Sequence, residues 1–215
     1  MELTFKKELA RKFVHFLSLF ILLIYFVAAD YFNSQTALLI LVLILIIFLE
    51  LEYFRIEIPK KIPILNKIWR YVRRDKEKDK LGGDVFFLIG GILALAIFDT
   101  RIAIAAILMT TFGDMAAALI GKRFGKIWLS EDRALEGITA EFFVDLVIGY
   151  FVFLRSSLFN FSLVFNWQIW ILIIIMAVTA TFVETIVRKL DDNLLIPIFS
   201  GFSGQLALIL LNLKV

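Results

Sequence analysis

The stretch WQIWILIIIMAVTATFVETIV, residues 167–187, determines the class of this protein. Glu184 is its only charged residue, and its 21 residues are enough to cross a bilayer as a helix, which takes about 17 to 25. The rest of the chain is similar: 61% of its 215 residues are hydrophobic, 20% are charged, and the mean hydropathy is +0.90. These values exclude a water-soluble globular domain and predict an all-α integral membrane protein.

Other apolar segments of comparable length lie on both sides of this stretch. We predict a bundle of about seven transmembrane helices, at residues 13–29, 36–51, 81–98, 102–120, 138–154, 167–187 and 194–213. The first of them, preceded by basic residues and ending at Ala29, also matches a signal peptide. A retained helix suits Arg11, Lys12 and His15 better. No repeat or linker divides the chain, so we expect one domain over residues 1–215.

The distribution of basic residues predicts the orientation. Cytoplasmic loops close to a membrane collect Lys and Arg. If the N-terminus is cytoplasmic, 20 of the 23 basic residues fall on the cytoplasmic side. Ten of them lie in residues 53–80 among apolar side chains, which predicts a basic loop on the inner surface of the membrane. We therefore expect a multi-pass protein of the cell membrane. The net charge of +3 is too small to indicate that the protein binds nucleic acid.

Cysteine is absent and there is one histidine, which excludes disulfides, thiol nucleophiles and sites with several histidines. The polar residues that stand out are carboxylates inside spans, each of which costs about 2.5 to 3.5 kcal/mol at the bilayer centre. All of them fall in the cytoplasmic halves of their helices, whereas the outer halves are almost purely apolar. This favours an enzyme with a cavity open to the cytoplasm over a small transporter or scaffold. These carboxylates are Asp84, Asp114, Glu141, Asp145 and Glu184.

Glu141 and Asp145 are four residues apart and share one helical face. Two like charges there repel unless a cation lies between them or one is protonated. A salt bridge from Glu141 to a loop lysine is the alternative.

Small residues recur every four positions from Gly113 to Gly125, which predicts close approach of another helix. The segment GKRFGK, residues 121–126, follows Asp114 at a cytoplasmic helix end. Its cations could pair with phosphate oxygens, its glycines could turn backbone amides toward an anion, and Asp114 could hold a bridging Mg²⁺. A positive-inside stop sequence explains the cations equally well. The candidate phosphate-binding residues are Gly121, Lys122, Arg123, Gly125 and Lys126.

The last cytoplasmic loop carries Asp191, Asp192 and Asn193 before an apolar helix. Asn193 is well suited to cap that helix. The group could equally bind a metal or a ribose.

Four blocks in order resemble the CTP-dependent polyprenol and lipid kinase family, which includes dolichol kinases, phytol kinases and CTP-dependent diacylglycerol kinases. They are ELARKFVH (8–15), FGDMAAALIGKRFGK (112–126), LEG (135–137) and FVETIVRKLDDNLLIP (182–197). Where the family often has hydroxyl residues around Glu-Gly, this chain has Ala134 and Ile138, and Thr139 is one position away.

The resemblance implies transfer of the γ-phosphate of CTP to the hydroxyl of a membrane lipid alcohol, with Mg²⁺ or another divalent cation. We expect dolichol or another polyprenol as substrate, with diacylglycerol, phytol or geranylgeraniol as alternatives. A CTP-dependent phospholipid cytidylyltransferase is the competing enzyme class. The positions that match the family are Arg11, Lys12, Asp114, Gly121, Glu184, Asp192 and Asn193. Together with the chemistry of the charged segments, they lead us to expect Asp114 and Glu184 as metal ligands and Glu141 or Glu184 as the group that accepts the hydroxyl proton. The expected nucleotide contacts are Arg11, Lys12, Gly121, Lys122, Arg123, Gly125, Lys126, Asp192 and Asn193.

Overall fold

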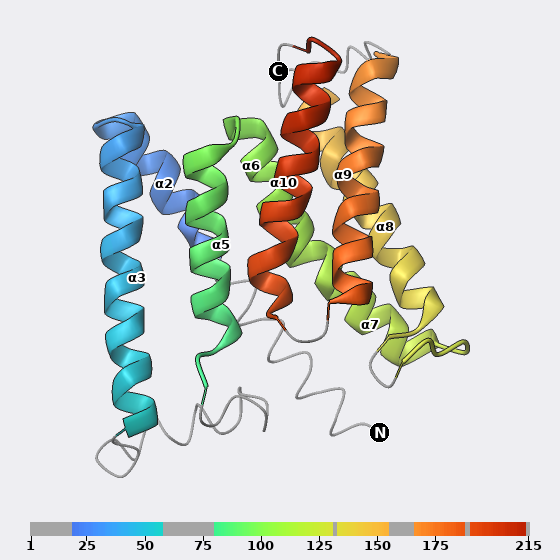
Figure 1. Cartoon of the computed structure of the whole chain (residues 1–215), viewed down its shortest axis with the longest axis horizontal. Helices are drawn as coiled ribbons and strands as arrows, with labels where there is room; N and C mark the ends of the chain where they lie inside the picture. The colour runs from blue at the N-terminus through green and yellow to red at the C-terminus, as the bar shows by residue number, and fades with distance from the viewer. Residues whose placement is uncertain (1–18, 58–79, 131–132, 155–165, 188–189, 214–215) are drawn as a thin grey trace. The chain divides into compact units, whose positions relative to one another are not determined.

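The computed structural model describes residues 19–57, 80–130, 133–154, 166–187 and 190–213 (Figure 1). The regular elements of these residues are all helices, with no strand among them, as the sequence predicts. Arg11 and Lys12, and residues 58–79 of the predicted surface loop, lie outside them. The elements in chain order are α2 (Phe20–Tyr31), α3 (Ser34–Glu57), α5 (Gly83–Ile97), α6 (Thr100–Leu108), η2 (Met109–Gly113), α7 (Asp114–Phe124), α8 (Leu135–Gly149), η3 (Tyr150–Leu154), α9 (Trp167–Ile186) and α10 (Asp192–Leu210).

The helical segments follow the order of the predicted spans. Elements α6, η2 and α7 form one continuous helix, Thr100–Phe124, and η3 continues α8. Four segments in the described residues are long and apolar enough to cross a membrane: Ser34–Glu57, Thr100–Phe124, Trp167–Ile186 and Asp192–Leu210. Elements α2 and α5 are apolar but shorter. The all-α class is confirmed, and a bundle of seven spans stays a prediction.

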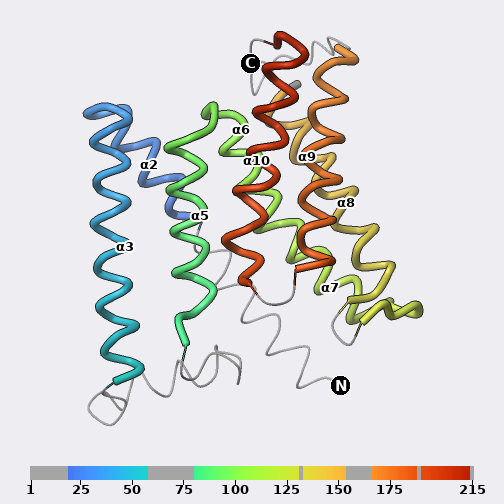
Figure 2. The backbone as a smooth tube through the Cα atoms, in the orientation of Figure 1, coloured from blue at the N-terminus to red at the C-terminus, as the bar shows by residue number. Residues whose placement is uncertain are grey.

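The chain divides into two compact units, residues 1–92 and 93–215. In the first unit α2 and α3 are antiparallel and pack side by side (Figure 2). The side-chain oxygen of Asn33 accepts the N–H of Thr36 at 2.8 Å and so satisfies a donor at the start of α3. Tyr25 and Leu41 are buried, whereas Leu39 is 69% exposed. Exposed apolar side chains of this kind suit a helix that contacts lipid.

Helix α3 ends at Glu57, beyond the end of the predicted span at residue 51. The charged residues that suggested a loop are paired: Arg55 donates to both carboxylate oxygens of Glu52, at 3.0 and 2.8 Å. The N–H of Gly82 also donates to Glu52, at 3.0 Å. Because the buried charges neutralise each other, the helix continues, and residues 53–57 of the predicted loop are helical.

The second unit has a core built by α6, η2, α8, α9 and α10. Glycines permit close contact between its helices. A Cβ atom at Gly204 on α10 would lie 2.6 Å from the sulfur of Met176 on α9, so these two helices pack tightly (Figure 1). The largest fully buried side chains of this core include Ile102, Met109, Leu172, Ile173, Met176 and Ile196.

The polar turns of the second unit lie at one end. Figure 1 shows that the α7–α8 turn and the start of α10 lie at the same end, whereas α6 begins at the opposite end. The arrangement follows from helices that alternate in direction along the chain. That residues 121–137 and the loop before α10 share one side of the membrane stays a prediction.

Single cysteines at Lys122 and Arg101 should label from opposite sides of the membrane. Both residues are exposed, they lie near opposite ends of the continuous helix Thr100–Phe124, and the native chain has no cysteine. We expect Lys122→Cys to react with an impermeant maleimide only in inside-out vesicles and Arg101→Cys only in right-side-out vesicles. Labelling of both variants from the same side would contradict a membrane-crossing Thr100–Phe124 helix.

Candidate functional site

A turn of π-helix, η2, directly precedes Asp114. The hydroxyl groups of Thr110 and Thr111 donate to the carbonyls of Ala106 and Ile107, at 2.8 and 3.1 Å. Such turns are rare and are often found at functional sites. Neither composition nor periodicity indicated this one, because a wide turn has no residue signature of its own.

Gly113, the last residue of η2, lies against two buried carboxylates of α8. A Cβ atom at Gly113 would be 2.6 Å from Oδ1 of Asp145 and 3.3 Å from Cγ of Glu141. Glu141 and Asp145 are 1% and 0% exposed, and Asp114 is 9% exposed. The shared face predicted for Glu141 and Asp145 is therefore confirmed, and it faces η2 just before Asp114.

Asp145 is a notable residue that the sequence left without a role. Neither of its side-chain oxygens has a hydrogen-bond partner among the described residues. A buried carboxylate in an apolar helix is expensive and usually functional. The four-residue spacing between Glu141 and Asp145, which places both on one helical face, was the feature of the sequence that could have assigned Asp145 to the site.

The α7–α8 contact confirms the prediction from the small-residue stripe. A Cβ atom at Gly137 would lie 2.5 Å from the carbonyl oxygen of Ala117 and 3.1 Å from the Cα of Gly121. The two backbones therefore touch where the predicted stripe faces the Leu-Glu-Gly block.

The GKRFGK segment is the end of a helix. Lys122 and Arg123 are exposed in the last turn of α7, and Lys126 is exposed after it. The N–H of Gly125 donates to the carbonyl of Gly121 at 2.9 Å, and its φ of −60° is ordinary. That amide caps the helix, so the predicted amide cradle does not form at Gly125. Contact with phosphate would come from the cationic side chains.

Residues 127–130 pair with residues 133 and 134 between α7 and α8, and these two paired segments form a short hairpin. The N–H of Leu129 donates to the carbonyl of Arg133 at 2.9 Å, and Trp128 pairs with Ala134 in an isolated antiparallel bridge. At the hairpin's end, the carboxylate of Glu136 accepts the N–H of Ile127 at 3.4 Å. Its own backbone N–H, aided by those of Lys126 and Ile127, holds the pKa of Glu136 below its ordinary value.

Arg133 connects the acidic ends of two other helices. Its guanidinium forms an ion pair with Glu184 near the end of α9, and its Nη2 lies 3.3 Å from Oδ2 of Asp192 at the start of α10. Glu184 is 1% exposed, so the arginine supplies its counter-charge. The sequence interpretation placed Glu184 and Asp192 at the site but missed Arg133, which looked like one of many loop cations.

The cap of α10 differs from the prediction. The N–H of Asn193 donates to the side chain of Asp191 at 3.1 Å and to that of Asp192 at 3.0 Å. Asp191 is therefore the N-cap residue in place of Asn193. Asp192 is left with a second oxygen that faces Arg133.

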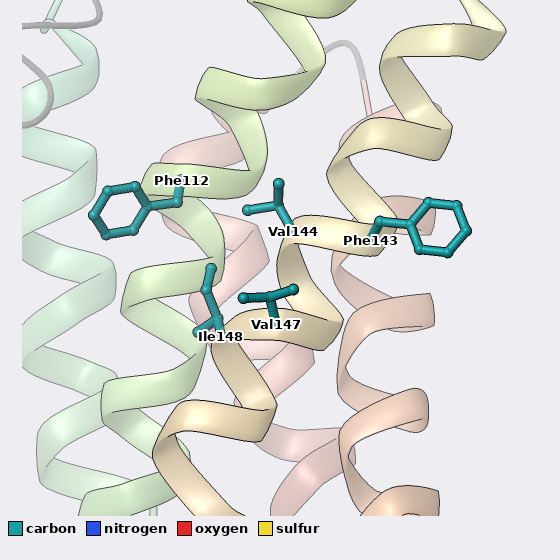
Figure 3. A pocket seen from close by; sticks show the side chains of 5 residues that line it. All are labelled: Phe112, Phe143, Val144, Val147 and Ile148. Carbon is teal, nitrogen blue, oxygen red and sulfur yellow. The ribbon is translucent and has the colours of Figure 1, made fainter. Parts of the chain in front are cut away.

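An apolar groove of about 400 Å³ is lined by residues of η2 and α8, the segments that also carry Gly113 and the buried Glu141 and Asp145 (Figure 3). One wall is Phe112, the residue before Gly113, and the other is α8, including Val144 and Ile148. The groove and the buried carboxylates thus belong to the same pair of helical segments. The residues that line it are Phe112, Phe143, Val144, Val147 and Ile148.

The described contacts do not join Asp114 to Glu184, the two predicted metal ligands. No group of three or more acidic or histidine side chains that could hold a metal occurs in the residues that the structure describes. Mg²⁺ commonly takes one or two protein carboxylates and completes its shell with phosphates and water. Asp114 fits that kind of shared site, in which the nucleotide supplies the other ligands.

Two curated proteins are similar to this chain, and both are named CTP-dependent diacylglycerol kinase 1. The protein from Eremothecium gossypii is 26% identical over 155 residues, which is 68% of this chain and 48% of that protein. The protein from Schizosaccharomyces pombe is 28% identical over 147 residues, which is 64% of this chain and 66% of that protein. The chain thus spans about half of the first relative and about two thirds of the second.

These relatives confirm the resemblance to the CTP-dependent lipid kinase family that the four sequence blocks indicate. No family model matches the chain. No solved structure matches it.

Proposed function

We propose that this protein is a CTP-dependent lipid kinase and that diacylglycerol is its first candidate substrate. The observation that carries the proposal is the juxtaposition of buried carboxylates and a wholly apolar groove on η2 and α8. A lipid alcohol combines a hydroxyl with an apolar chain, and this arrangement offers a place for each. The sequence alone favoured dolichol or another polyprenol, but the names of the two relatives favour diacylglycerol.

The nucleotide side of the proposed site is the polar end of the second unit. Lys122, Arg123 and Lys126 are exposed there and would pair with the triphosphate oxygens. Asp114, with Glu184 as the candidate second ligand, would hold a divalent cation that neutralises phosphate charge. Arg11 and Lys12 stay candidates for the same role by resemblance.

The lipid side is the groove between η2 and α8. The chain of the lipid would lie along Phe112 and Val144, with its hydroxyl toward Asp145 and Glu141. In the transfer, the lipid oxygen bonds to the γ-phosphorus, the bond from that phosphorus to the β–γ bridging oxygen breaks, and CDP leaves. The hydroxyl proton passes to one of the two carboxylates, which are buried next to each other on one face of α8.

Labelled CTP tests the reaction class. Purified protein in mixed micelles is supplied with CTP labelled at the γ-phosphate or at the α-phosphate, and the extracted lipid is counted. We expect γ-label in the lipid and no α-label. Transfer of α-label would identify a cytidylyltransferase, and transfer of neither label would overturn the proposal.

A panel of lipid alcohols tests the substrate. We expect kcat/KM for diacylglycerol to exceed the values for dolichol, phytol and geranylgeraniol by about tenfold or more, the difference that about 1.4 kcal/mol of transition-state binding produces. A preference for a polyprenol would restore the substrate that the sequence favoured.

A further inference from the structure

The ion pairs of Arg133 have no part in the roles assigned so far. Asp192 is 59 residues further along the chain than Arg133, and Glu184 belongs to a different helix from Asp192. The planar guanidinium has five donors and can serve two carboxylates at once, which the ammonium group of lysine does with less defined geometry. One side chain thus joins the α7–α8 hairpin to the ends of α9 and α10.

The hairpin that carries Arg133 is itself held against the cationic end of α7. Ala134 lies beside Gly125, at 2.7 Å from where a Cβ atom at that glycine would be. The N–H of Leu135 donates to the carbonyl of Ile127 at 2.8 Å, which closes the hairpin. Arg133 is therefore a side-chain link between the acidic helix ends and the hairpin next to Lys122 and Arg123.

We propose that Arg133 is a positioning residue for nucleotide binding. It fixes the positions of Glu184 and Asp192 relative to the cations that follow Gly121. The two carboxylates and the cationic side chains can then contact the metal-bound triphosphate at the same time. This inference rests on the proposed kinase function. It assigns a role to a residue outside the motifs that carried the family resemblance.

Kinetics of Arg133 variants test the proposal. In Arg133→Gln we expect the KM for CTP to rise by about tenfold or more, because both carboxylates lose their partner, while kcat changes by less than about threefold. Arg133→Lys keeps the positive charge but lacks the planar guanidinium that can bind two carboxylates, so its KM for CTP should lie between those of Arg133→Gln and wild type. Arg101→Gln, which removes an exposed arginine at the opposite end of the unit, is the matched control and should behave as wild type.

A double-mutant cycle with Asp192→Asn tests whether Arg133 acts through its partner. The combined variant should raise the KM by less than the product of the two single effects, since each change breaks the same link. Additive effects, or an unchanged KM in folded Arg133→Gln, would overturn the proposal. If Arg133→Gln does not fold, the same comparison with Arg133→Lys decides.

Hydrogen exchange gives a readout that needs no catalysis. Without Arg133 the hairpin amides of residues 127–130 and 133–135 and the first turn of α10 should exchange faster, because those segments lose their common anchor. Exchange equal to wild type in both segments would contradict the link. If wild-type protein transfers no phosphate from CTP, the proposed kinase function fails, and this measurement still tests Arg133.

Discussion

Asp114→Asn should abolish phosphate transfer while the protein still inserts and folds. The substitution keeps the shape of the side chain and removes the charge that would hold a cation beside the phosphates. Charge stabilisation of this kind contributes several kcal/mol, so we expect a loss of about a thousandfold or more in kcat/KM. The measurement is transfer of γ-label from CTP to lipid by purified, monodisperse variant.

The matched control is Asp99→Asn. Asp99 caps the other end of the same continuous helix by accepting the N–H of Arg101 at 3.0 Å, and asparagine caps helices equally well. This variant should keep wild-type activity. Activity within about threefold of wild type in Asp114→Asn would remove Asp114 from the site.

Gly137→Ala should have the next largest effect, on folding as well as activity. The added methyl would lie 2.5 Å from the carbonyl oxygen of Ala117, in backbone that cannot move without separating α7 from α8. Overpacking at such contacts costs about 1 to 3 kcal/mol or more, and here it also displaces the carboxylates of α8. We expect a clear drop in the unfolding temperature in detergent and a large loss of transfer.

Gly121→Ala tests whether Gly121, at the same α7–α8 contact, is needed for helix packing or for nucleotide binding. Its added methyl would be 3.6 Å from the nearest atom, the Cα of Gly137, which is an ordinary contact distance. The unfolding temperature should therefore change little. A loss of activity in this stable variant would support a nucleotide role for Gly121, and equal destabilisation of both glycine variants would contradict the packing described for Gly137.

Local sequence patterns were sufficient for the helical class, the order of the segments and the α7–α8 contact. Apolar length predicts spans because a lipid-exposed backbone must satisfy its own hydrogen bonds. The spacing of Gly113, Ala117 and Gly121 predicts a close helix neighbour because small residues every four positions share one helix face and let another backbone approach. The end of α3 was misplaced because charged residues normally stop a span, whereas Glu52 and Arg55 pair with each other.

The burial of candidate site residues could be predicted where a residue type in a given setting usually has one role. Carboxylates inside apolar helices are such a case, and Glu141 is buried as expected. Arg133 could not be distinguished from other loop cations, since its partners lie far away in the sequence. The cap at Asp191 was missed because neighbouring aspartate and asparagine residues are both good caps, and only backbone geometry decides between them.

The π turn at Met109–Gly113 makes the number of residues before Asp114 as important as their identity. A π turn holds one residue more than the regular α-helix that flanks it, so deleting one residue from this turn would convert it to regular α-helix. Ala117 and Gly121 would keep the face that meets α8, but the wide backbone turn at Gly113, against which Asp145 and Glu141 lie, would be lost. A chain shortened by one residue here should therefore still pack α7 on α8 and yet lack the wide turn beside Asp114, which separates the role of the turn from that of the helix packing.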